Sequence, residues 1–152
     1  MPATCLIAEA DPFIANLLLR FAEESGLNSV RAKTGQEMSA LVHQLHPDVL
    51  IVEPELPGEQ RGWEVVRALR AEAEDKAGVK AEAQTENVVS ASTLTLTSPV
   101  AVISCSWLER TEAHKLLGAV AWHLQKPNLY YGDFVKALKA AGVATEECSA
   151  PG

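Results

Sequence analysis

Short runs of apolar residues recur along the chain, and each of them stops at a polar or charged side chain. The clearest run is DVLIVEPELPGE at residues 48–59, where four consecutive aliphatic residues end at Glu53, ahead of a Pro-Gly turn. Similar runs are TCLIAEADP, PVAVISCS and AWHLQKP, and LNSVRAK is a weaker one. An unbroken apolar run of this length favours a strand buried on both faces of a sheet. The sequence therefore predicts five strands, with the weak second one at the edge of the sheet.

Between and after these runs, apolar residues recur at helical spacing. The segments with this period cover residues 12–26, 34–47, 61–75, 108–119 and 130–142. In the first, Asp11 is the predicted N-cap and Pro12 takes the first helical position. In the second, Thr34 and Glu37 match a capping box. In the third, an Ala/Glu-rich stretch is expected to prolong the helix to about Asp75.

The alternation of strands and helices predicts the fold class. Strands that alternate with helices form βαβ units, in which a parallel sheet is covered by helices on both faces. Right-handed crossovers then leave few possible topologies. We expect a flavodoxin-like (βα)5 fold in three layers, with a doubly wound parallel sheet in the strand order 2-1-3-4-5.

One stretch, residues 71–98, breaks this rhythm. Connections in such folds are usually ~2–6 residues long, so we interpret it as an insertion before the fourth strand. Its second half alternates Thr with Leu, as a half-exposed strand does. It is either an extra strand, a partner contact or a tolerated surface loop. The predicted organisation is one domain of residues 1–142, followed by a flexible tail at residues 143–152.

Composition narrows the function classes. The formal net charge is −7, which argues against nucleic acid as a direct partner, because phosphate binding needs clustered Lys and Arg. No apolar run approaches the ~20 residues of a membrane span, and no signal peptide is recognisable. The three cysteines are widely spaced and predict neither a zinc site nor a disulfide framework. We expect a cytoplasmic protein that binds no membrane.

Polar side chains follow the predicted strands. The carboxyl ends of parallel strands meet at one edge of a sheet, where ligands gather at the switch in strand order. At these ends the chain has, in order, Glu9, Asp11, Glu53, Ser104 with Cys105 beside it, His123 and Lys126. We expect these side chains to converge on one crevice.

Four motifs, LIAEADP, DVLIVEPELPG, PVAVISCS and HLQKP, occur in this order and resemble those of the receiver domain of two-component response regulators. The resemblance covers about residues 4–142, apart from the insertion. It implies that Glu53 occupies the position of the phosphate-accepting aspartate and that Glu9 matches the first of two adjacent acids. The hydroxyl, switch and lysine positions of the family are matched by Ser104, His123 and Lys126.

Two departures from the family's pattern bear on chemistry. Receiver phosphorylation needs Mg²⁺, which demands near-octahedral oxygen ligands at about 2.0–2.1 Å, and Ala10 offers no ligand where the family has its second acid. Glu53 has one methylene more than aspartate, and a misplacement of ~1 Å can cost ~100-fold in rate. We therefore expect no cofactor, with Mg²⁺ disfavoured by Ala10. The weak candidate metal ligands are Glu9, Asp11, Glu53 and Glu55.

The resemblance and its departures together predict a degenerate receiver. Such a domain would act in a two-component or phosphorelay context through protein–protein interaction, independently of phosphorylation and not as an enzyme. We expect Lys126 to pair with Glu53, and Ser104 to donate a hydrogen bond there, which partly imitates the phosphorylated state. The expected partner is a signalling protein or an output domain, or a second copy bound through residues 108–142.

Other interpretations stay open at this point. Glu53 could be a salt-bridged strand end without a signalling role. The chain could be a functional phosphoacceptor with a shifted Mg²⁺ site that uses Asp11. It could also be a small α/β hydrolase-like enzyme, in which Ser104 or Cys105 acts with His123.

Some residues have two readings. His123 is either a histidine at the edge of the core, held by one hydrogen bond, or a moving switch. The three tryptophans are expected to fill gaps between helices and sheet. For two of them, Trp107 and Trp122, the alternative is to anchor a partner surface.

Overall fold

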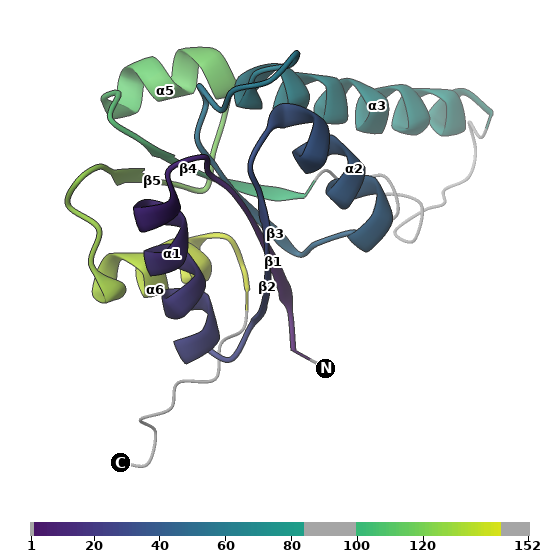
Figure 1. Ribbon diagram of the computed structural model, residues 1–152. Helices are drawn as coiled ribbons and strands as arrows, with labels where there is room; N and C mark the ends of the chain where they lie inside the picture. The colour runs from purple at the N-terminus through teal and green to yellow at the C-terminus, as the bar shows by residue number, and fades with distance from the viewer. Residues whose placement is uncertain (1, 84–99, 144–152) are drawn as a thin grey trace.

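The computed structural model describes residues 2–83 and 100–143, in which strands and helices alternate (Figure 1). The strands are β1 (Thr4–Ala8), β2 (Asn28–Ala32), β3 (Val49–Val52), β4 (Ala101–Ser106) and β5 (Trp122–Gln125). The helices are α1 (Pro12–Glu24), α2 (Gly35–Leu45), α3 (Gly62–Ala83), α5 (Arg110–Leu117) and α6 (Tyr131–Ala140). Each predicted strand and helix is therefore present in the described residues.

The five strands form one parallel sheet in the order β2-β1-β3-β4-β5. The register places Ile7 of β1 beside Ile51 of β3, and Ile51 beside Ile103 of β4. The weak strand β2 lies at one edge, as predicted. The doubly wound, flavodoxin-like arrangement expected from the alternation of elements is confirmed.

Each face of the sheet buries its own apolar cluster, because alternate residues of a strand point to opposite sides. On one side, α1 and α6 cover a cluster that includes Ile7, Ile51 and Phe134. On the other side, α2, α3 and α5 cover a cluster that includes Leu6 and Leu50. The result is the predicted stack of three layers.

The helix starts follow their capping residues. Asp11 accepts hydrogen bonds from the backbone N–H groups of Phe13 and Ile14 at 2.8 and 3.3 Å, which confirms the predicted N-cap of α1. Thr34 accepts from the N–H of Glu37 at 3.2 Å. The return bond of the capping box is shifted by one residue, because the carboxylate of Glu37 accepts from the N–H of Lys33 at 2.7 Å.

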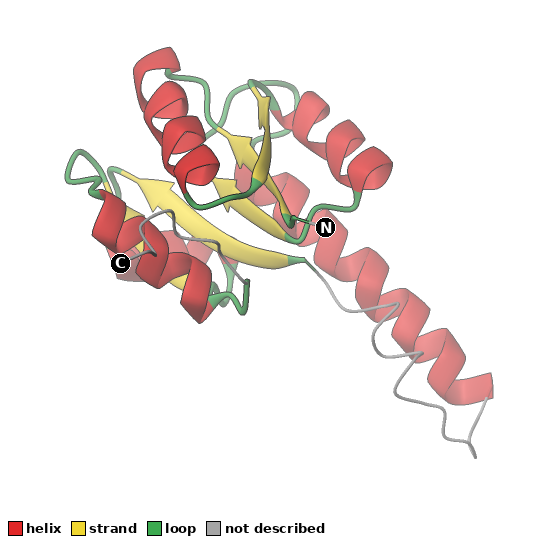
Figure 2. Ribbon diagram, turned by 90° about the horizontal axis from the view of Figure 1, so that it is seen from below, coloured by secondary structure: helices red, strands yellow, loops and turns green. Residues whose placement is uncertain are grey.

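Helix α3 is longer than the sequence pattern suggested. It continues to Ala83, well past the expected end near Asp75, and Figure 2 shows it running beyond the edge of the sheet. Ala, Glu and Lys dominate residues 71–83, and all three have high helix propensity. The alternating Thr/Leu half of the predicted insertion lies outside the described residues. Of the described helices, none is long and apolar enough to cross a membrane.

Candidate functional site

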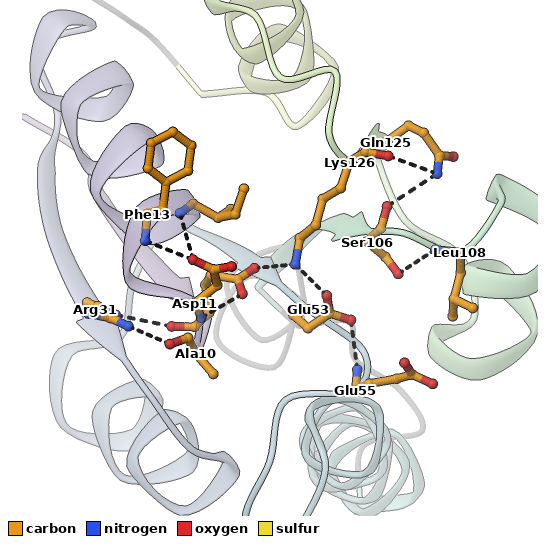
Figure 3. Close-up of polar contacts among 12 residues, drawn as sticks. Ala10, Asp11, Phe13, Arg31, Glu53, Glu55, Ser106, Leu108, Gln125 and Lys126 are labelled. Atoms are coloured by element: carbon orange, nitrogen blue, oxygen red, sulfur yellow. Dashed lines mark hydrogen bonds and ion pairs between the residues drawn. The ribbon is translucent and has the colours of Figure 1, made fainter.

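The centre of the site is the ammonium group of Lys126, which lies between two carboxylates (Figure 3). Its Nζ is 2.7 Å from Oε1 of Glu53 and 2.8 Å from Oε1 of Glu9. The three residues follow β5, β3 and β1, so the parallel sheet brings them to the same edge. All three are buried, with exposed fractions of 4% for Lys126, 8% for Glu53 and 3% for Glu9. The contact expected between Lys126 and Glu53 is present, and Glu9 joins it.

The backbone holds the second oxygen of each carboxylate. Oε2 of Glu53 accepts a hydrogen bond from the N–H of Glu55, and Oε2 of Glu9 accepts one from the N–H of Asp11, both at 3.0 Å. The contact between Lys126 and Glu53 is an aligned hydrogen bond. The contact between Lys126 and Glu9 is at ion-pair distance without that alignment. Glu53 is therefore the more directional partner of the ammonium.

The charges around Lys126 set its pKa. Burial acts to lower the pKa of the ammonium, because it penalises the charged form. The hydrogen bond to Glu53, the close contact with Glu9 and the negative charges of both act in the opposite direction and prevail, so the pKa of Lys126 is raised above its ordinary value. Lys126 is thus held in its charged form at neutral pH.

Asp11 does not join the buried group. Its carboxylate is used at the start of α1, where it accepts from two backbone N–H groups and meets the positive end of the helix dipole. The backbone N–H of Glu55 donates to Glu53, and Glu55 itself is an exposed residue. Of the acids predicted to converge here, Glu9 and Glu53 lie together in the buried group, whereas Asp11 caps helix α1.

Arg31 is a residue of the site that sequence reasoning missed. It lies on the edge strand β2, and its guanidinium donates from Nε to the carbonyl of Glu9 at 3.1 Å and from Nη2 to the carbonyl of Ala10 at 2.9 Å. These bonds fasten the loop between β1 and α1 (Figure 3). The pattern of polar and apolar residues in β2 did not predict these bonds, because it shows which face of the sheet a side chain leaves from but not that a long side chain reaches a neighbouring loop.

Ser104 has different partners from those expected. Strand β4 continues to Ser106, so Ser104 lies two positions before its end. Ser104 pairs in register with Val52, and paired side chains share a face, so Glu53, the next residue, points away from that face. The hydroxyl of Ser104 lies 2.6 Å from Nδ1 of His123 and 3.4 Å from the carbonyl oxygen of Trp122.

His123 is held more firmly than a single hydrogen bond would hold it. Its Nε2 lies 3.1 Å from the carbonyl oxygen of Leu108 and 3.2 Å from Oε1 of Gln125, in addition to the Ser104 contact at Nδ1. Because the Leu108 carbonyl can only accept, the hydrogen of the neutral ring belongs on Nε2, and Nδ1 accepts from Ser104. The ring is therefore fixed in one tautomer at the edge of the sheet.

Ser106 is the hydroxyl nearest the end of β4, and sequence reasoning passed over it. It is 1% exposed, and its Oγ accepts from the N–H of Leu108 at 2.9 Å. Its carbonyl accepts from the N–H of Lys126 at 2.9 Å, which joins the end of β4 to the residue that follows β5. The signal was present in the sequence Ser-Cys-Ser, but which serine ends the strand depends on how far the ladder to β5 extends.

Cys105 is too deeply buried for a reactive thiol, whereas two of the tryptophans are too exposed to fill gaps in the core. Cys105 is 1% exposed, and burial raises the pKa of its thiol to about 12. Trp107 and Trp122 are 62% and 38% exposed, so the expectation that they fill gaps between helices and sheet is wrong. Trp107 lies in the loop after β4 and Trp122 begins an edge strand, where packing from neighbours is incomplete. Trp63 lies under the guanidinium of Arg67, whose Cζ is 4.9 Å from the ring centroid.

The residues present do not fit a Mg²⁺ site. Among residues 2–74 and 100–143, no three His, Cys, Asp or Glu side chains gather as metal ligands. Mg²⁺ requires several oxygens in near-octahedral geometry. The facing oxygens of Glu9 and Glu53 are instead bound to Lys126, and Asp11 caps a helix.

No protein-family model and no curated protein sequence matches this chain. Solved structures do match. The receiver domain of a Francisella response regulator has 20% sequence identity and a TM-score of 0.65, over 92% of this chain and 97% of its own. A CheY-like receiver domain from Methylobacillus flagellatus has 15% identity and a TM-score of 0.63, over 93% and 99%.

A third match is the receiver domain of a sensor histidine kinase from Pseudomonas aeruginosa, whose structure holds a magnesium ion in its active-site cleft. It has 14% identity and a TM-score of 0.67, over 93% of this chain and 99% of its own. At such identities, the similarity shows the fold. The chain has the fold of response-regulator receiver domains.

Proposed function

We propose that this chain is a receiver-like signalling domain of a two-component or phosphorelay system that acts by binding a partner protein and does not pass through a phosphorylated state. The observation that carries the proposal is the buried 2.7 Å hydrogen bond between Lys126 and Glu53. In the family that the chain resembles, this position carries a phosphoryl group that is added and removed. Glu53 places a permanent negative charge there instead. The domain would then hold one signalling state constitutively.

The imitation of a phosphorylated state is partial. Glutamate carries one negative charge, whereas a phosphorylated side chain carries about −1.5 to −2 at pH 7. Ser104 does not add a hydrogen bond to Glu53, since its hydroxyl is engaged with His123. What Glu53 supplies is a fixed anion that keeps Lys126 in place.

A functional phosphoacceptor with a shifted Mg²⁺ site is the nearest alternative. It would need Asp11 to turn into the site, and this carboxylate would have to give up two bonds at the start of α1, a cap worth about 0.5–2 kcal/mol. It would also need Glu53 to leave Lys126. The two costs favour the phosphorylation-independent function.

Exposed aromatic residues support a protein partner. Trp107 and Tyr130 are each 62% exposed, and Trp122 is 38% exposed. Tyr and Trp are the residues that most often dominate the binding energy of protein interfaces. They lie in or beside residues 108–142, where we propose that a signalling protein, an output domain or a second copy binds. The net charge of −7 disfavours nucleic acid.

We propose that the chain is not an enzyme. The 2.6 Å contact between Ser104 and His123 has the spacing of a nucleophile and its base. However, Ser104 is fully buried, and Nε2 of His123 faces a carbonyl and an amide oxygen where a hydrolase would place a carboxylate. Cys105 is buried with a pKa of about 12, which keeps it a thiol.

Phosphotransfer tests the proposal directly. The full chain is incubated with acetyl phosphate or phosphoramidate and Mg²⁺, and its intact mass is measured. We expect no added phosphoryl group. The matched variant is Ala10→Asp/Glu53→Asp, which restores the acid pair and the shorter acceptor and tests whether those two departures are responsible. A stable phosphoryl adduct on Glu53 of the unmodified chain would overturn the proposal.

A further inference from the structure

Three of the four oxygens of the two buried carboxylates accept a hydrogen bond, and the fourth, Oε1 of Glu9, lies at ion-pair distance from Lys126. Glu53 binds Lys126 with Oε1 and the N–H of Glu55 with Oε2. Glu9 faces Lys126 with Oε1 and accepts from the N–H of Asp11 with Oε2. The ammonium group of Lys126 thus bridges two acids that follow different strands. Without it, the two buried negative charges would have no cation between them.

A second cation stands on the other side of the same loop. Arg31 binds the carbonyl oxygens of Glu9 and Ala10, the two residues that connect β1 to the cap of α1. The two bonds come from different nitrogens of one planar group, which fixes the direction of the loop as well as its distance. In this position Arg31 holds the backbone that points Glu9 at Lys126.

The local charges are then nearly balanced. Glu9 and Glu53 contribute two negative charges, and Lys126 and Arg31 contribute two positive ones within the same set of contacts. The charge of Asp11 meets the start of α1. Buried carboxylates without a nearby cation are strongly disfavoured, so a site of this composition needs either an internal cation or a bound one.

We propose that two side-chain cations, Lys126 as the bridge and Arg31 as the positioning residue, replace a divalent metal ion in this chain, so that the site keeps its shape whether or not Mg²⁺ is present. The inference rests on the proposed function in that it concerns the same site. It adds that the fixed state is maintained by the chain's own charges. Removing the bridging cation should therefore uncover a latent site for a divalent ion.

The first experiment measures metal binding and thermal unfolding of the full chain, with Mn²⁺ titrated calorimetrically and with Mg²⁺ compared against EDTA. For the unmodified chain we expect no saturable Mn²⁺ binding and the same Tm in Mg²⁺ and EDTA. For Lys126→Met, which keeps a long apolar stem without charge, we expect a Tm lower by on the order of 10 °C. Mg²⁺ should recover at least half of that loss, and saturable Mn²⁺ binding should appear.

Two further variants separate this explanation from a general loss of stability. Glu9→Gln/Lys126→Met removes one of the two charges that repel each other, and should be more stable than Lys126→Met in EDTA while losing the response to Mg²⁺. Lys136→Met alters an exposed lysine of α6 and should change neither Tm nor metal binding. If Lys126→Met does not fold in EDTA, recovery of folding in Mg²⁺ is the expected result.

The role of Arg31 has its own measurement, which is amide hydrogen exchange at Asp11. Arg31→Met should speed that exchange at least tenfold, because the loop that presents this N–H to Glu9 is released. Lys33→Met, an exposed lysine just after β2, should leave it unchanged.

Three results would overturn the proposal: saturable Mn²⁺ binding by the unmodified chain, Lys126→Met that stays indifferent to Mg²⁺, or unchanged Asp11 exchange in Arg31→Met. None of these measurements involves a phosphoryl donor or a partner, so their failure is distinguishable from failure of the proposed function.

Discussion

Ser104 and His123 lie opposite each other on β4 and β5, with the hydroxyl oxygen 2.6 Å from Nδ1 of the ring. The other ring nitrogen reaches the carbonyl oxygen of Leu108, just before α5. One histidine thus links the interior of the sheet to the segment that starts a helix. Ser104, which the sequence placed beside Glu53, serves this link.

Removing the hydroxyl tests the link. Ser104→Ala leaves Nδ1 of the half-buried His123 without a donor, and should lower the free energy of unfolding by about 1–3 kcal/mol. The chemical shift of Nδ1 should move towards that of a ring nitrogen without a hydrogen-bond donor, whereas Nε2 should keep its hydrogen, because the carbonyl of Leu108 still accepts it. Thr111→Ala, at an exposed position of α5, is the matched control and should change the stability little. An unchanged Nδ1 chemical shift in Ser104→Ala would contradict the assigned hydrogen bond.

Removing the charge of Glu53 while keeping the size of its side chain should lower the stability. Glu53→Gln removes one of the two carboxylates that face the buried ammonium of Lys126, and we expect a loss of about 1–3 kcal/mol in urea unfolding. Glu55→Gln removes an exposed charge two residues later and should stay within about 0.5 kcal/mol of the unmodified chain. Equal losses in the two variants would show that the contact between Lys126 and Glu53 contributes little.

The same contact predicts an alkaline limit to stability. The pKa of Lys126 is raised in the folded chain, whereas in the unfolded chain it is near ~10.4. Its contribution is therefore fully present below about pH 10.4 and is lost as the pH rises through the higher folded value. The difference in unfolding free energy between the unmodified chain and Glu53→Gln should shrink above about pH 10.4, because titration of other groups is common to both. A difference that stays constant to the highest pH at which the chain folds would refute this.

Gly118 has a positive φ of 81° after α5, and an added Cβ would lie 2.7 Å from Nη1 of Arg70. Arg67 and Arg70 reach from α3 to the end of α5: Arg67 binds carbonyls within the last turn, and Arg70 binds those of Leu117 and of Ala119, which follows the helix. Gly118→Ala should therefore lower the unfolding free energy by about 1–3 kcal/mol and speed amide exchange in α5.

The control for this glycine is Gly132, which lies inside α6 with open space where a Cβ would stand. Gly132→Ala should stabilise the chain by about 0.4–1 kcal/mol, because alanine loses less backbone entropy in a helix. If both alanine variants changed the stability in the same direction, the conformation assigned to Gly118 would be wrong.

Cys105 should resist alkylation in the folded chain. Its thiol is buried and its pKa is raised to about 12, chiefly by burial, so little thiolate exists at neutral pH. In a Cys148→Ser background, iodoacetamide at pH 8 should modify Cys105 only as fast as the chain unfolds, and urea should abolish the protection. Rapid modification under native conditions would reopen the interpretation of Cys105 as a nucleophile.

The sequence was informative where the relevant distances along the chain are short. Strand runs, helix periods and the caps at Asp11 and Thr34 all depend on neighbours within a few positions, and these were found close to their predicted places. The end of β4 was less predictable, because whether Ser104 or Ser106 ends the strand depends on pairing with β5. For the same reason, the sequence left two interpretations of Trp107 and Trp122 open, and their exposure rules out the one in which they fill gaps between helices and sheet.

The order of buried strands and amphipathic helices follows from the sequence alone, and this order brings Glu9, Glu53 and Lys126 to one edge of the sheet. Which atoms meet there follows from how the strands and loops are arranged in space. The ammonium of Lys126 contacts both acids, and the guanidinium of Arg31 binds backbone carbonyls of a loop rather than an acid. The cause is the length of the Lys and Arg side chains. The periodicity of the sequence shows which face of a strand or helix a side chain leaves from, but the partner that a long charged side chain contacts depends on how the strands are placed in space.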